Sequence, residues 1–456
     1  MGKMRVTIFW FRRDLRVEDN AGLYHALRGA GPNGPAKNRE GSRAMGEAPV
    51  LPLFIFDRTI LDRLESKADR RVEFIQAAVE HLQVKLVEWG SSLEVRDGKP
   101  VEVFRDLLME YEVAAVVANT DYEPDAVERD KAVGQLLAEG GVAFHTYKDQ
   151  VIFEKDEVVK EDGSPYTVYT PYSRRWRAKV NEFYLSEYPT GKWRGRFVRR
   201  GPRAVPSLEA LGFVRTGGPF PRDVIAPGVF EHYKDRRDLP AVAGTSRLGV
   251  HLRFGTVSVR ELARRAVRES DVFLGELIWR DFFQTIIWHF PAMGRGRAFK
   301  PAYEHIRWRN DEREFEKWCA GETGFPLVDA GMRELNATGF MHNRVRMVAA
   351  SFLAKHLLID WRWGEAYFAE KLLDFDLAAN NGNWQWAAGC GCDAAPYFRI
   401  FNPMAQAKRW DPRGEYIRRW VPELDEMRYP PPMVDHELAR KRALEVYRRA
   451  VAGVNG

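Results

Sequence analysis

The stretch RVTIFWF (residues 5–11) is a short, continuous apolar run close to the start of the chain. Its length and its content of β-branched and aromatic residues are typical of a buried strand. Four more runs of this kind follow, and the segments between them have the spacing of amphipathic helices. These runs are VLPLFIF (50–56), SLEV (92–95), AAVVANT (114–120) and VAFHTY (142–147), with helices expected near 67–89, 101–111 and 125–139. The alternation predicts a doubly wound, Rossmann-like α/β domain with a mostly parallel sheet over residues 1–150.

The pattern changes twice after residue 150. From 151 to 230 proline, glycine and arginine are frequent and periodicity is weak, which indicates a long connector. One helix is expected to begin at YTPYSRRWRAKV (169–180). After 231 nearly every periodic segment has helical spacing, and ten of the fourteen tryptophans lie at position 279 or later. We therefore expect an all-helical domain over residues 231–456 with an aromatic-rich core.

Two loops of the first domain carry further information. GAGPNGPAKNREGSRAMGEA (29–48) is rich in glycine, proline and alanine, so we expect a mobile loop inserted before the second strand. FRRDLRVEDN (11–20) follows the first strand and contains no G-x-G-x-x-G pattern. A standard dinucleotide site is therefore not predicted at this turn.

The composition is that of a globular protein, with 45% hydrophobic and 29% charged residues. No apolar run approaches membrane-spanning length, and the first apolar run is too short for a signal peptide. The three cysteines are Cys319, Cys390 and Cys392, an odd number that argues against a disulfide framework and favours a reducing cytoplasm. Because the C-x-C pair has no second Cys/His pair nearby, we expect a tight turn there and no metal site.

The net charge of +6 permits a nucleic-acid partner without requiring one. Arginines alternate with aromatic or apolar residues in several runs after residue 170, such as SRRWR (173–177) and MHNRVRM (341–347). The planar arginine side chain suits phosphate contacts, which favours nucleic acid. A solvated helix face would explain any single run equally well.

Three motifs could bind a ligand. GTSRLG (244–249) offers hydroxyls, an arginine and successive backbone N–H groups, which suits either a phosphate cradle or an ordinary turn. Glu276, Trp279 and Arg280 stand at i, i+3 and i+4 on an expected helix, as a pocket wall or a surface cluster. Asn343, Arg346 and Met347 likewise share a face suited to a polar, planar ligand, whereas Arg344 points elsewhere and His342 is interpreted as an ordinary helix histidine.

The stretch DFDLAANNGNWQW (374–386) combines acids, amides and indoles. Asp374 and Asp376 are two residues apart, so they cannot share a helix face and must lie in a bend or at a helix start. They can accept hydrogen bonds from a ligand or from an arginine such as Arg346, although Asp374 could instead cap a helix near 364–373. Asn380 would lie on the face of Asp376. No Ser-His-Asp or Cys-His arrangement can be assembled, so hydrolytic nucleophilic catalysis is not predicted.

Taken together, seven motifs resemble those of the DNA photolyase/cryptochrome family, most closely the bacterial class I cyclobutane pyrimidine dimer photolyases. They are WFRRDLRVEDN (10–20), DLPAVAGTSRLG (238–249), ELIWRDFF (276–283), TGFPLVDAGMRELNATGFMHNRVRM (323–347), LLIDW (357–361), DFDLAANNGNWQWAAG (374–389) and DAAPYFRIFNP (393–403). The similarity covers nearly the whole chain and is dense from 233 to 420. It implies an N-terminal antenna domain and a C-terminal helical domain that holds FAD, whose reduced form is the active one.

In that family, light-excited reduced FAD gives an electron to a flipped-out pyrimidine dimer in UV-damaged DNA, the cyclobutane ring splits, and the electron returns. The resemblance implies a role for particular residues of this chain. The cofactor-binding positions are Tyr233, Thr245, Ser246, Arg247, Leu248, Arg346, Asp374, Asp376 and Asn380. The substrate and DNA positions are Glu276, Trp279, Arg280, Asn343, Arg344, Met347, Trp386 and Arg399. The catalytic positions are Glu276, Asn380 and the electron-hopping tryptophans Trp308, Trp361 and Trp384.

The chemistry implied for two of these residues can be stated. Asn380 would face flavin N5, where a neutral amide suits either protonation state. Glu276 would hydrogen-bond the edge of the dimer and stabilise its radical anion.

The resemblance also separates the alternatives. Photolyases for the (6-4) lesion carry histidines where this chain has Asn343 and Met347, which disfavours that function. A cryptochrome photoreceptor usually has a C-terminal extension, whereas this sequence ends with LEVYRRAVAGVNG (444–456). A non-catalytic nucleotide-binding protein on an α/β domain is the third alternative. DNA is the expected partner, with no membrane and no obligate protein partner, so the protein is expected to be a cytoplasmic monomer.

Two positions depart from the family pattern. Phe375 stands between the two aspartates where dimer photolyases more often have glycine. Asp125 and Ala126 stand where well-known folate-binding members carry an Asn-Glu pair. A second, light-harvesting chromophore is expected in the N-terminal domain, and deazaflavin, folate and flavin all stay open for its identity.

Overall fold

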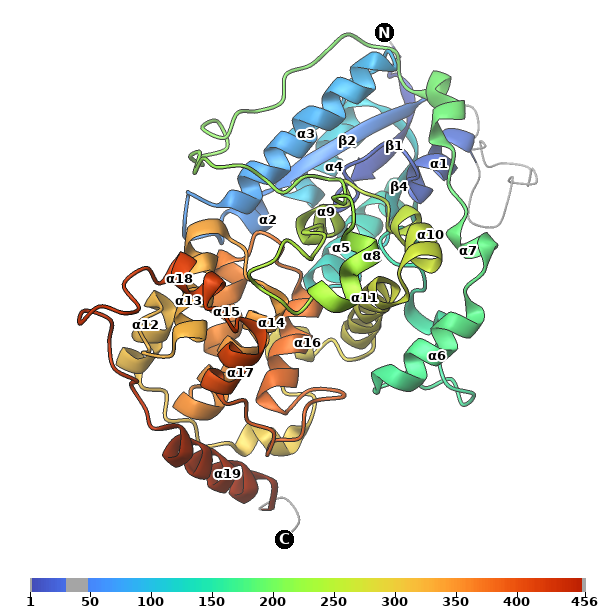
Figure 1. Ribbon diagram of the computed structural model, residues 1–456. Coiled ribbons are helices and arrows are strands. Elements are labelled where there is room, and N and C mark those ends of the chain that lie inside the picture. Colours follow the sequence, from blue (N-terminus) through green and yellow to red (C-terminus); the bar gives the residue numbers. More distant parts are fainter. Residues whose placement is uncertain (1, 30–47, 453–456) are drawn as a thin grey trace. The chain divides into compact units, whose positions relative to one another are not determined.

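The computed structural model describes residues 2–29 and 48–452, so the loop expected over 29–48 lies, apart from its two end residues, outside the described residues. The chain forms two compact units (Figure 1). The first unit comprises 1–154, 179–223 and 248–265, and the second comprises 155–178, 224–247 and 266–456. These units divide the predicted connector between them and place 248–265 with the first unit.

The first unit is built around a five-stranded parallel sheet with the strand order β3-β2-β1-β4-β5. Figure 1 labels three of these strands, β1, β2 and β4. The strands are β1 (Arg5–Phe11), β2 (Val50–Asp57), β3 (Glu94–Gly98), β4 (Glu112–Asn119) and β5 (Ala143–Tyr147). The doubly wound α/β prediction is confirmed. The prediction that all five strands are buried was wrong for β5, which is half-exposed at one edge of the sheet. In the run predicted at 92–95, Ser92, Leu93 and Glu94 are buried, and the rest of the edge strand β3 is partly exposed.

Both faces of the central strand β1 are covered. Val6, Ile8 and Trp10 pack into one hydrophobic cluster with alternate residues of β2 and β4, while Phe9 and Phe11 are buried on the opposite face. This two-sided burial explains why the strand reads as a continuous apolar run rather than an alternating one. The helices of this part of the chain are α1 (Ala21–Arg28), α2 (Arg58–Leu61), α3 (Arg70–Glu88), α4 (Pro100–Glu110), α5 (Pro124–Glu139), α7 (Glu182–Leu185) and α9 (Gly249–Phe254).

The loop after β1 leads directly into α1, a helix that was not predicted from the sequence. Asn20 caps α1 by accepting a hydrogen bond from the backbone N–H of Leu23. The buried Arg16 pairs with Asp149 at 2.8 Å. Although burial alone would raise the pKa of Asp149, Arg16 and Arg260 lower it to about 2. The loop is therefore a packed, charge-compensated element at the carboxyl ends of β1 and β4, where the strand order reverses.

The second unit is helical, as predicted for this part of the chain. Its main helices are α6 (Tyr169–Lys179), α8 (Val229–Arg236), α11 (Asp271–His289), α12 (Glu312–Ala320), α13 (Pro326–Thr338), α14 (Asn343–Ser351), α15 (Trp361–Lys371), α16 (Leu377–Ala388), α17 (Pro403–Trp410), α18 (Glu415–Trp420) and α19 (His436–Ala452), with a π-helix over Phe352–Leu357. Helix α10 (Val259–Glu269) spans the boundary between the two units. Within the described ranges, none of the helices is both long and apolar enough to cross a membrane.

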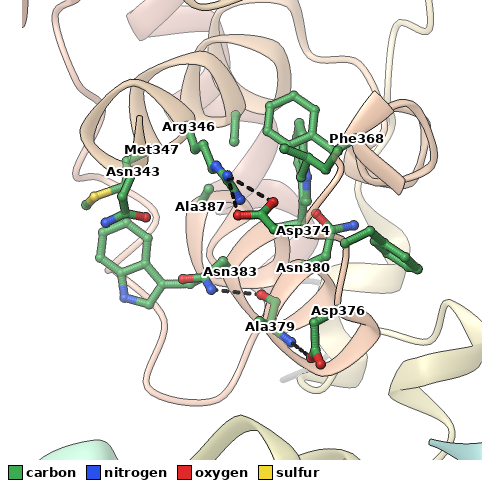
Figure 2. A pocket seen from close by; sticks show the side chains of 15 residues that line it. Asn343, Arg346, Met347, Phe368, Asp374, Asp376, Ala379, Asn380, Asn383 and Ala387 are labelled. Carbon is green, nitrogen blue, oxygen red and sulfur yellow. Dashed lines mark hydrogen bonds and ion pairs between the residues drawn. The ribbon is translucent and has the colours of Figure 1, made fainter. Parts of the chain in front are cut away.

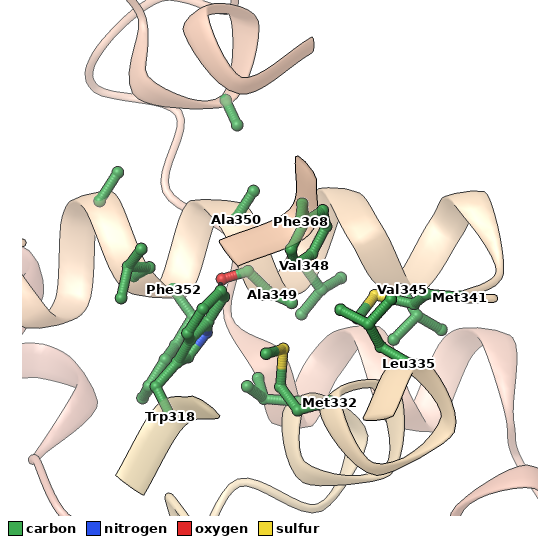
Figure 3. Packing of buried hydrophobic residues seen from close by; sticks show 14 of the residues in the cluster. Trp318, Met332, Leu335, Met341, Val345, Val348, Ala349, Ala350, Phe352 and Phe368 are labelled. Atoms are coloured by element: carbon green, nitrogen blue, oxygen red, sulfur yellow. Dashed lines mark hydrogen bonds between the residues drawn. The ribbon is translucent and has the colours of Figure 1, made fainter. Parts of the chain in front are cut away.

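The core of the second unit is rich in aromatic residues, as predicted (Figure 3). Trp318 is fully buried in it and donates a hydrogen bond from its indole N–H to the carbonyl of Ala349 at 3.2 Å. Helix α14 buries Val345, Val348 and Ala349 in this cluster. Because α-helical residues three or four apart share a face, Asn343, Arg346 and Met347 are left on another side of α14. That side lines the candidate site.

Candidate active site

Helices α14 and α16 and the bend before α16 enclose a hollow of about 570 Å³, part of which is open to solvent (Figure 2). Eight of the residues assigned to the site from the sequence line it. They are Asn343, Arg346, Met347, Asp374, Asp376, Asn380, Trp384 and Trp386. Apolar walls come from Phe368, Leu372, Phe375 and Ala387. The hollow therefore combines one guanidinium, two carboxylates and several amides with apolar and aromatic surface.

An ion pair closes one side of the hollow. The guanidinium of Arg346 lies 2.9 Å from a carboxylate oxygen of Asp374, and its Nε donates to the carbonyl of Met341 (Figure 2). Asp374 follows α15 by three residues and accepts from this arginine, so the predicted pairing with Arg346 is confirmed. The two charges compensate one another, and Arg346 also lies over the ring of Phe340.

Asp376 begins α16. It accepts a hydrogen bond from the backbone N–H of Ala379, as an N-cap does (Figure 2). The amide of Gln284, on α11, also donates to both of its oxygens at 3.2 Å. Gln284 is a buried residue that no sequence motif marked, and its own amide oxygen has no hydrogen-bond partner among the described residues.

Asn380 is held in one orientation by Glu365. Its amide nitrogen donates to the Glu365 carboxyl at 2.9 Å and to the Glu365 main-chain carbonyl at 3.1 Å. Both amide hydrogens are therefore in use, and the side-chain oxygen Oδ1 is left as an acceptor. The amide was expected to be adaptable, but this pair of bonds fixes it as an acceptor. Nothing in the sequence marked Glu365, whose pKa is raised by burial.

Phe375, the departure from the family pattern, packs against the hydrophobic cluster and lines the hollow. The φ angle of Phe375 is not positive. Its backbone therefore needs no glycine, and the aromatic ring adds apolar surface beside Asp374 and Asp376.

A second group of predicted residues lies on α8 and α11. Arg237 follows α8, and its guanidinium lies 2.5 Å from the carboxylate of Glu276 and over the ring of Tyr233. Burial raises the pKa of Glu276, and Arg237 opposes that shift. The indole of Trp279 stacks face to face on Tyr169, with ring centroids 3.6 Å apart. Arg237 was not predicted as a site residue, although it links two residues that were.

The remaining arginines occupy different environments. Arg344 pairs with Asp238 at 2.8 Å and lies over the indole of Trp410, so its charge is partly compensated. Arg280 is half-buried in α11, and Arg399 is exposed in the segment between α16 and α17. Arg247 adopts a left-handed backbone conformation and lies over Phe340, the same ring that Arg346 covers.

The other residues of the GTSRLG turn are less informative. Thr245 and Ser246 are half-buried. Leu248 is buried and belongs to the first unit, where it precedes α9. Beyond this turn, Ser258 caps α10 by accepting from the backbone N–H of Glu261.

The three tryptophans of the expected electron path share one core. Trp361 and Trp384 are each 2% exposed within the same cluster, and Trp308 packs against it. A side chain at Gly364 of α15 would place its Cβ 2.2 Å from the Trp384 ring, so only glycine leaves room for this indole. Trp384 also contacts Trp318, with ring centroids 6.1 Å apart. Trp318 was not assigned a role from the sequence.

One interpretation needs correction. His342 is not inside a helix but is the buried N-cap of α14, accepting from the backbone N–H of Arg344 at 3.2 Å. Burial lowers the pKa of His342 to about 4, so it acts as a neutral cap. Cys390 and Cys392 are buried thiols that follow Gly389, a glycine in the left-handed conformation, in agreement with the predicted turn.

Comparison with known proteins agrees with this geometry. The family models "DNA photolyase" and "FAD binding domain of DNA photolyase" match residues 7–190 and 273–428. A deoxyribodipyrimidine photo-lyase of Halobacterium salinarum is 38% identical over 97% of this chain and 99% of its own length. A class III photolyase from Agrobacterium tumefaciens has a TM-score of 0.83 at 31% identity, covering 99% of this chain and 98% of its own. An archaeal photolyase from Sulfolobus tokodaii with two FAD molecules has a TM-score of 0.80 at 32% identity, covering 98% and 100%.

Proposed function

The chain belongs to the DNA photolyase family, and from this premise we propose that it is a deoxyribodipyrimidine photo-lyase that uses light to repair cyclobutane pyrimidine dimers in DNA. The observation that carries the proposal is the hollow between α14 and α16, which gathers eight of the residues assigned from the sequence. The same proposal includes the class I assignment. It also includes the division of the chain into an antenna domain (1–150), a connector (151–230) and a FAD-binding domain (231–456).

The donor set of the hollow fits FAD. A ring system with one polar edge can meet the Arg346–Asp374 pair, while its faces meet apolar side chains such as Phe368 and Leu372. When bound, reduced FAD supplies the electron that light makes available and takes it back after the ring of the dimer has split. Asn380 Oδ1 accepts a hydrogen bond from a protonated ring nitrogen, because Glu365 occupies the amide hydrogens. Tyr233, Thr245, Ser246, Arg247, Leu248 and Asp376 hold the phosphates, ribose and remaining polar groups.

The same hollow and the α11 face receive the lesion. A dimer must leave the base stack before it can be repaired, and aromatic side chains are suited to receive extruded bases. Trp279, Trp386 and Met347 supply apolar surface, and Glu276 and Asn343 supply polar contacts to the base edges. Arg280, Arg344 and Arg399 contact the flanking phosphates, so affinity for DNA decreases as salt increases.

Glu276→Gln should lower the yield of dimer repair severalfold and leave the flavin content unchanged. The amide keeps the size of the side chain, but its N–H is a weaker hydrogen-bond donor than the O–H of a protonated carboxyl, which stabilises negative charge developing on the dimer. Burial favours the protonated form of Glu276, so repair by the wild type should fall as pH rises through the raised pKa, where the carboxyl ionises, and the variant should lack this dependence. Repair yield per absorbed photon, measured from pH 5 to pH 9, tests both points.

The matched control for that variant is Glu231→Gln, on α8, whose side chain is 76% exposed. It should repair like the wild type at every pH. If Glu276→Gln lost its flavin, or kept the fall of repair at higher pH, the role assigned to Glu276 would be wrong.

Asp238→Asn should raise affinity for DNA, because it frees the Arg344 guanidinium from its ion pair. The dependence of binding on salt should become steeper by up to about one phosphate contact. Fluorescence anisotropy with damaged and undamaged duplexes over a salt series measures both effects. Asp235→Asn removes the same charge from an exposed position of α8, so an equal gain from it would show that only the net charge matters.

We assign a second chromophore to the first unit, as expected for an antenna domain. The Sulfolobus tokodaii relative, described with two FAD molecules, supports a flavin there. Asp125, which stands where well-known folate-binding members carry asparagine, is exposed and pairs with Arg63. The enzyme works as a cytoplasmic monomer that associates with DNA.

A light-dependent repair assay tests the proposed function. The purified protein should show flavin absorbance, and after reduction it should restore thymine absorbance in dimer-containing DNA under blue light. Absence of flavin would favour the non-catalytic nucleotide-binding protein. Bound flavin without repair of either lesion would favour a cryptochrome photoreceptor, and repair of (6-4) DNA alone would favour the (6-4) photolyase.

A further inference from the structure

Lys355 is a buried lysine that the proposed mechanism does not use. It lies in the π-helix Phe352–Leu357, it is 1% exposed, and its ammonium nitrogen donates to the main-chain carbonyl of Arg399 at 2.8 Å. Lysine is rarely buried to this degree, because removing its charge from water is costly. A π-helix is also uncommon and is often found at functional sites. Both features indicate that Lys355 has a specific role, which depends on its hydrogen bond to the Arg399 carbonyl.

The carbonyl that Lys355 holds belongs to the segment 389–402, which joins α16 to α17. The backbone N–H of Arg399 donates to Pro396 in a turn of this segment. The Arg399 side chain is exposed and forms no ion pair with the residues that the structure describes. Phe398, beside it, is 62% exposed. The lysine thus fixes the backbone of a turn in which the side chains of Phe398 and Arg399 are exposed.

The π-helix that carries Lys355 is itself held in place by contacts with α19. The neighbouring His356 is fully buried, and its Nε2 lies 2.8 Å from Nδ1 of His436, the first residue of α19. Arg442 of α19 donates to the main-chain carbonyl of His356 at 2.6 Å. Lys355 therefore connects a rigid helical element to the exposed Arg399 turn.

We propose that Lys355 is a positioning residue for DNA binding, which acts by holding Arg399 where its guanidinium meets a phosphate beside the extruded dimer. This inference rests on the proposed function, in which Arg399 contacts DNA. Because Lys355 fixes this backbone before DNA binds, less conformational entropy is lost on binding. A phosphodiester is the group that would be recognised, since an exposed guanidinium without a carboxylate partner suits it.

The charge of Lys355 contributes to this anchor. Burial and, to a lesser extent, the nearby Arg399 lower the pKa of Lys355 to about 8, while Cys390 opposes the shift. His356 on the same element, and His436 and Arg442 on α19, are the other titratable groups packed there. A protonated amine makes a charge-assisted hydrogen bond, which is about twice as strong as a neutral one. Lesion binding should therefore weaken as pH rises through about 8.

The test uses the full chain loaded with FAD and a duplex that carries one cyclobutane dimer. Lys355→Met should weaken binding of this duplex about tenfold, since it removes a hydrogen bond to a charged donor. The flavin content and the repair yield at saturating DNA should not change, and the loss of affinity above pH 8 should disappear. Lys441→Met, which removes an exposed lysine from α19, is the control and should bind like the wild type.

A double variant separates positioning from a general structural role. If Lys355 acts through Arg399, Lys355→Met should cost nothing further in an Arg399→Gln background. An equal cost in both backgrounds, a loss of flavin, or wild-type affinity at every pH would overturn the inference. These outcomes leave the proposed function intact, because it would fail instead by absence of dimer repair in the wild-type protein.

Discussion

Arg346→Met should produce a protein that folds but purifies almost without flavin. Methionine keeps the length of the side chain and its apolar contacts with the hollow, yet it removes the guanidinium that lies 2.9 Å from Asp374. The partly buried Asp374 carboxylate then has no compensating charge, which costs more than the ion pair itself contributes. An unpaired carboxylate at the polar edge of the cofactor site should lower FAD affinity at least about tenfold. The ratio of flavin to protein absorbance measures this effect.

The control is Arg413→Met, whose side chain is 85% exposed and pairs with Glu415. It should keep its flavin in full. Asp374→Asn in the Arg346→Met background should recover part of the flavin, since it removes the unpaired charge. Full flavin content in Arg346→Met alone would show that FAD does not bind at this ion pair.

Trp308→Phe should slow light-driven reduction of the flavin on the order of tenfold or more, while repair by chemically reduced enzyme stays normal. A phenyl ring is much harder to oxidise than an indole, so an electron cannot enter the path at this position. Trp308 packs on the outside of the cluster that contains Trp361 and Trp384, and its ring meets Tyr447 edge to face at 6.1 Å. The rate at which flavin absorbance bleaches under blue light, with an external reductant present, measures the effect.

Trp318→Phe is the informative comparison, because the structure offers a competing path. The Trp318 ring lies 6.1 Å from Trp384 and is fully buried in the same core. If the assigned path is right, this variant should be reduced by light at close to the wild-type rate. Slow photoreduction in Trp318→Phe with normal photoreduction in Trp308→Phe would reassign the path to Trp318. Equal loss of photoreduction and repair in Trp308→Phe would contradict an electron-transfer role altogether.

Much of the fold could be predicted because its signals are local. The strands β1, β2 and β4 are buried on both faces, so they read as continuous apolar runs whatever lies around them. Helix α1 was not predicted because its N-cap, Asn20, ends a polar loop whose charged residues have the composition of a solvent-exposed segment. The edge strands β3 and β5 were predicted, but their exposure depends on strand order, which no local pattern encodes.

The candidate site divides in the same way. Asn343, Arg346 and Met347 share a helix face at fixed spacing, so their convergence could be expected from the sequence. Glu365 and Arg237 could not, because each meets its partner through tertiary packing between separate elements. Long-range hydrogen bonds leave no periodicity, and a lone glutamate or arginine usually indicates nothing more than a solvated surface.

The chain passes back and forth between its two units, which limits how each unit can fold during synthesis and where the protein can be truncated. The first unit is completed only by residues 248–265, and the second takes in 155–178 and 224–247. During synthesis, therefore, neither unit can finish folding until residue 265 has left the ribosome. A fragment that ends near residue 150 or 230 would lack native segments of its own unit. Contiguous pieces of this protein should consequently be unstable when expressed alone, and engineering of either unit is best done in the intact chain.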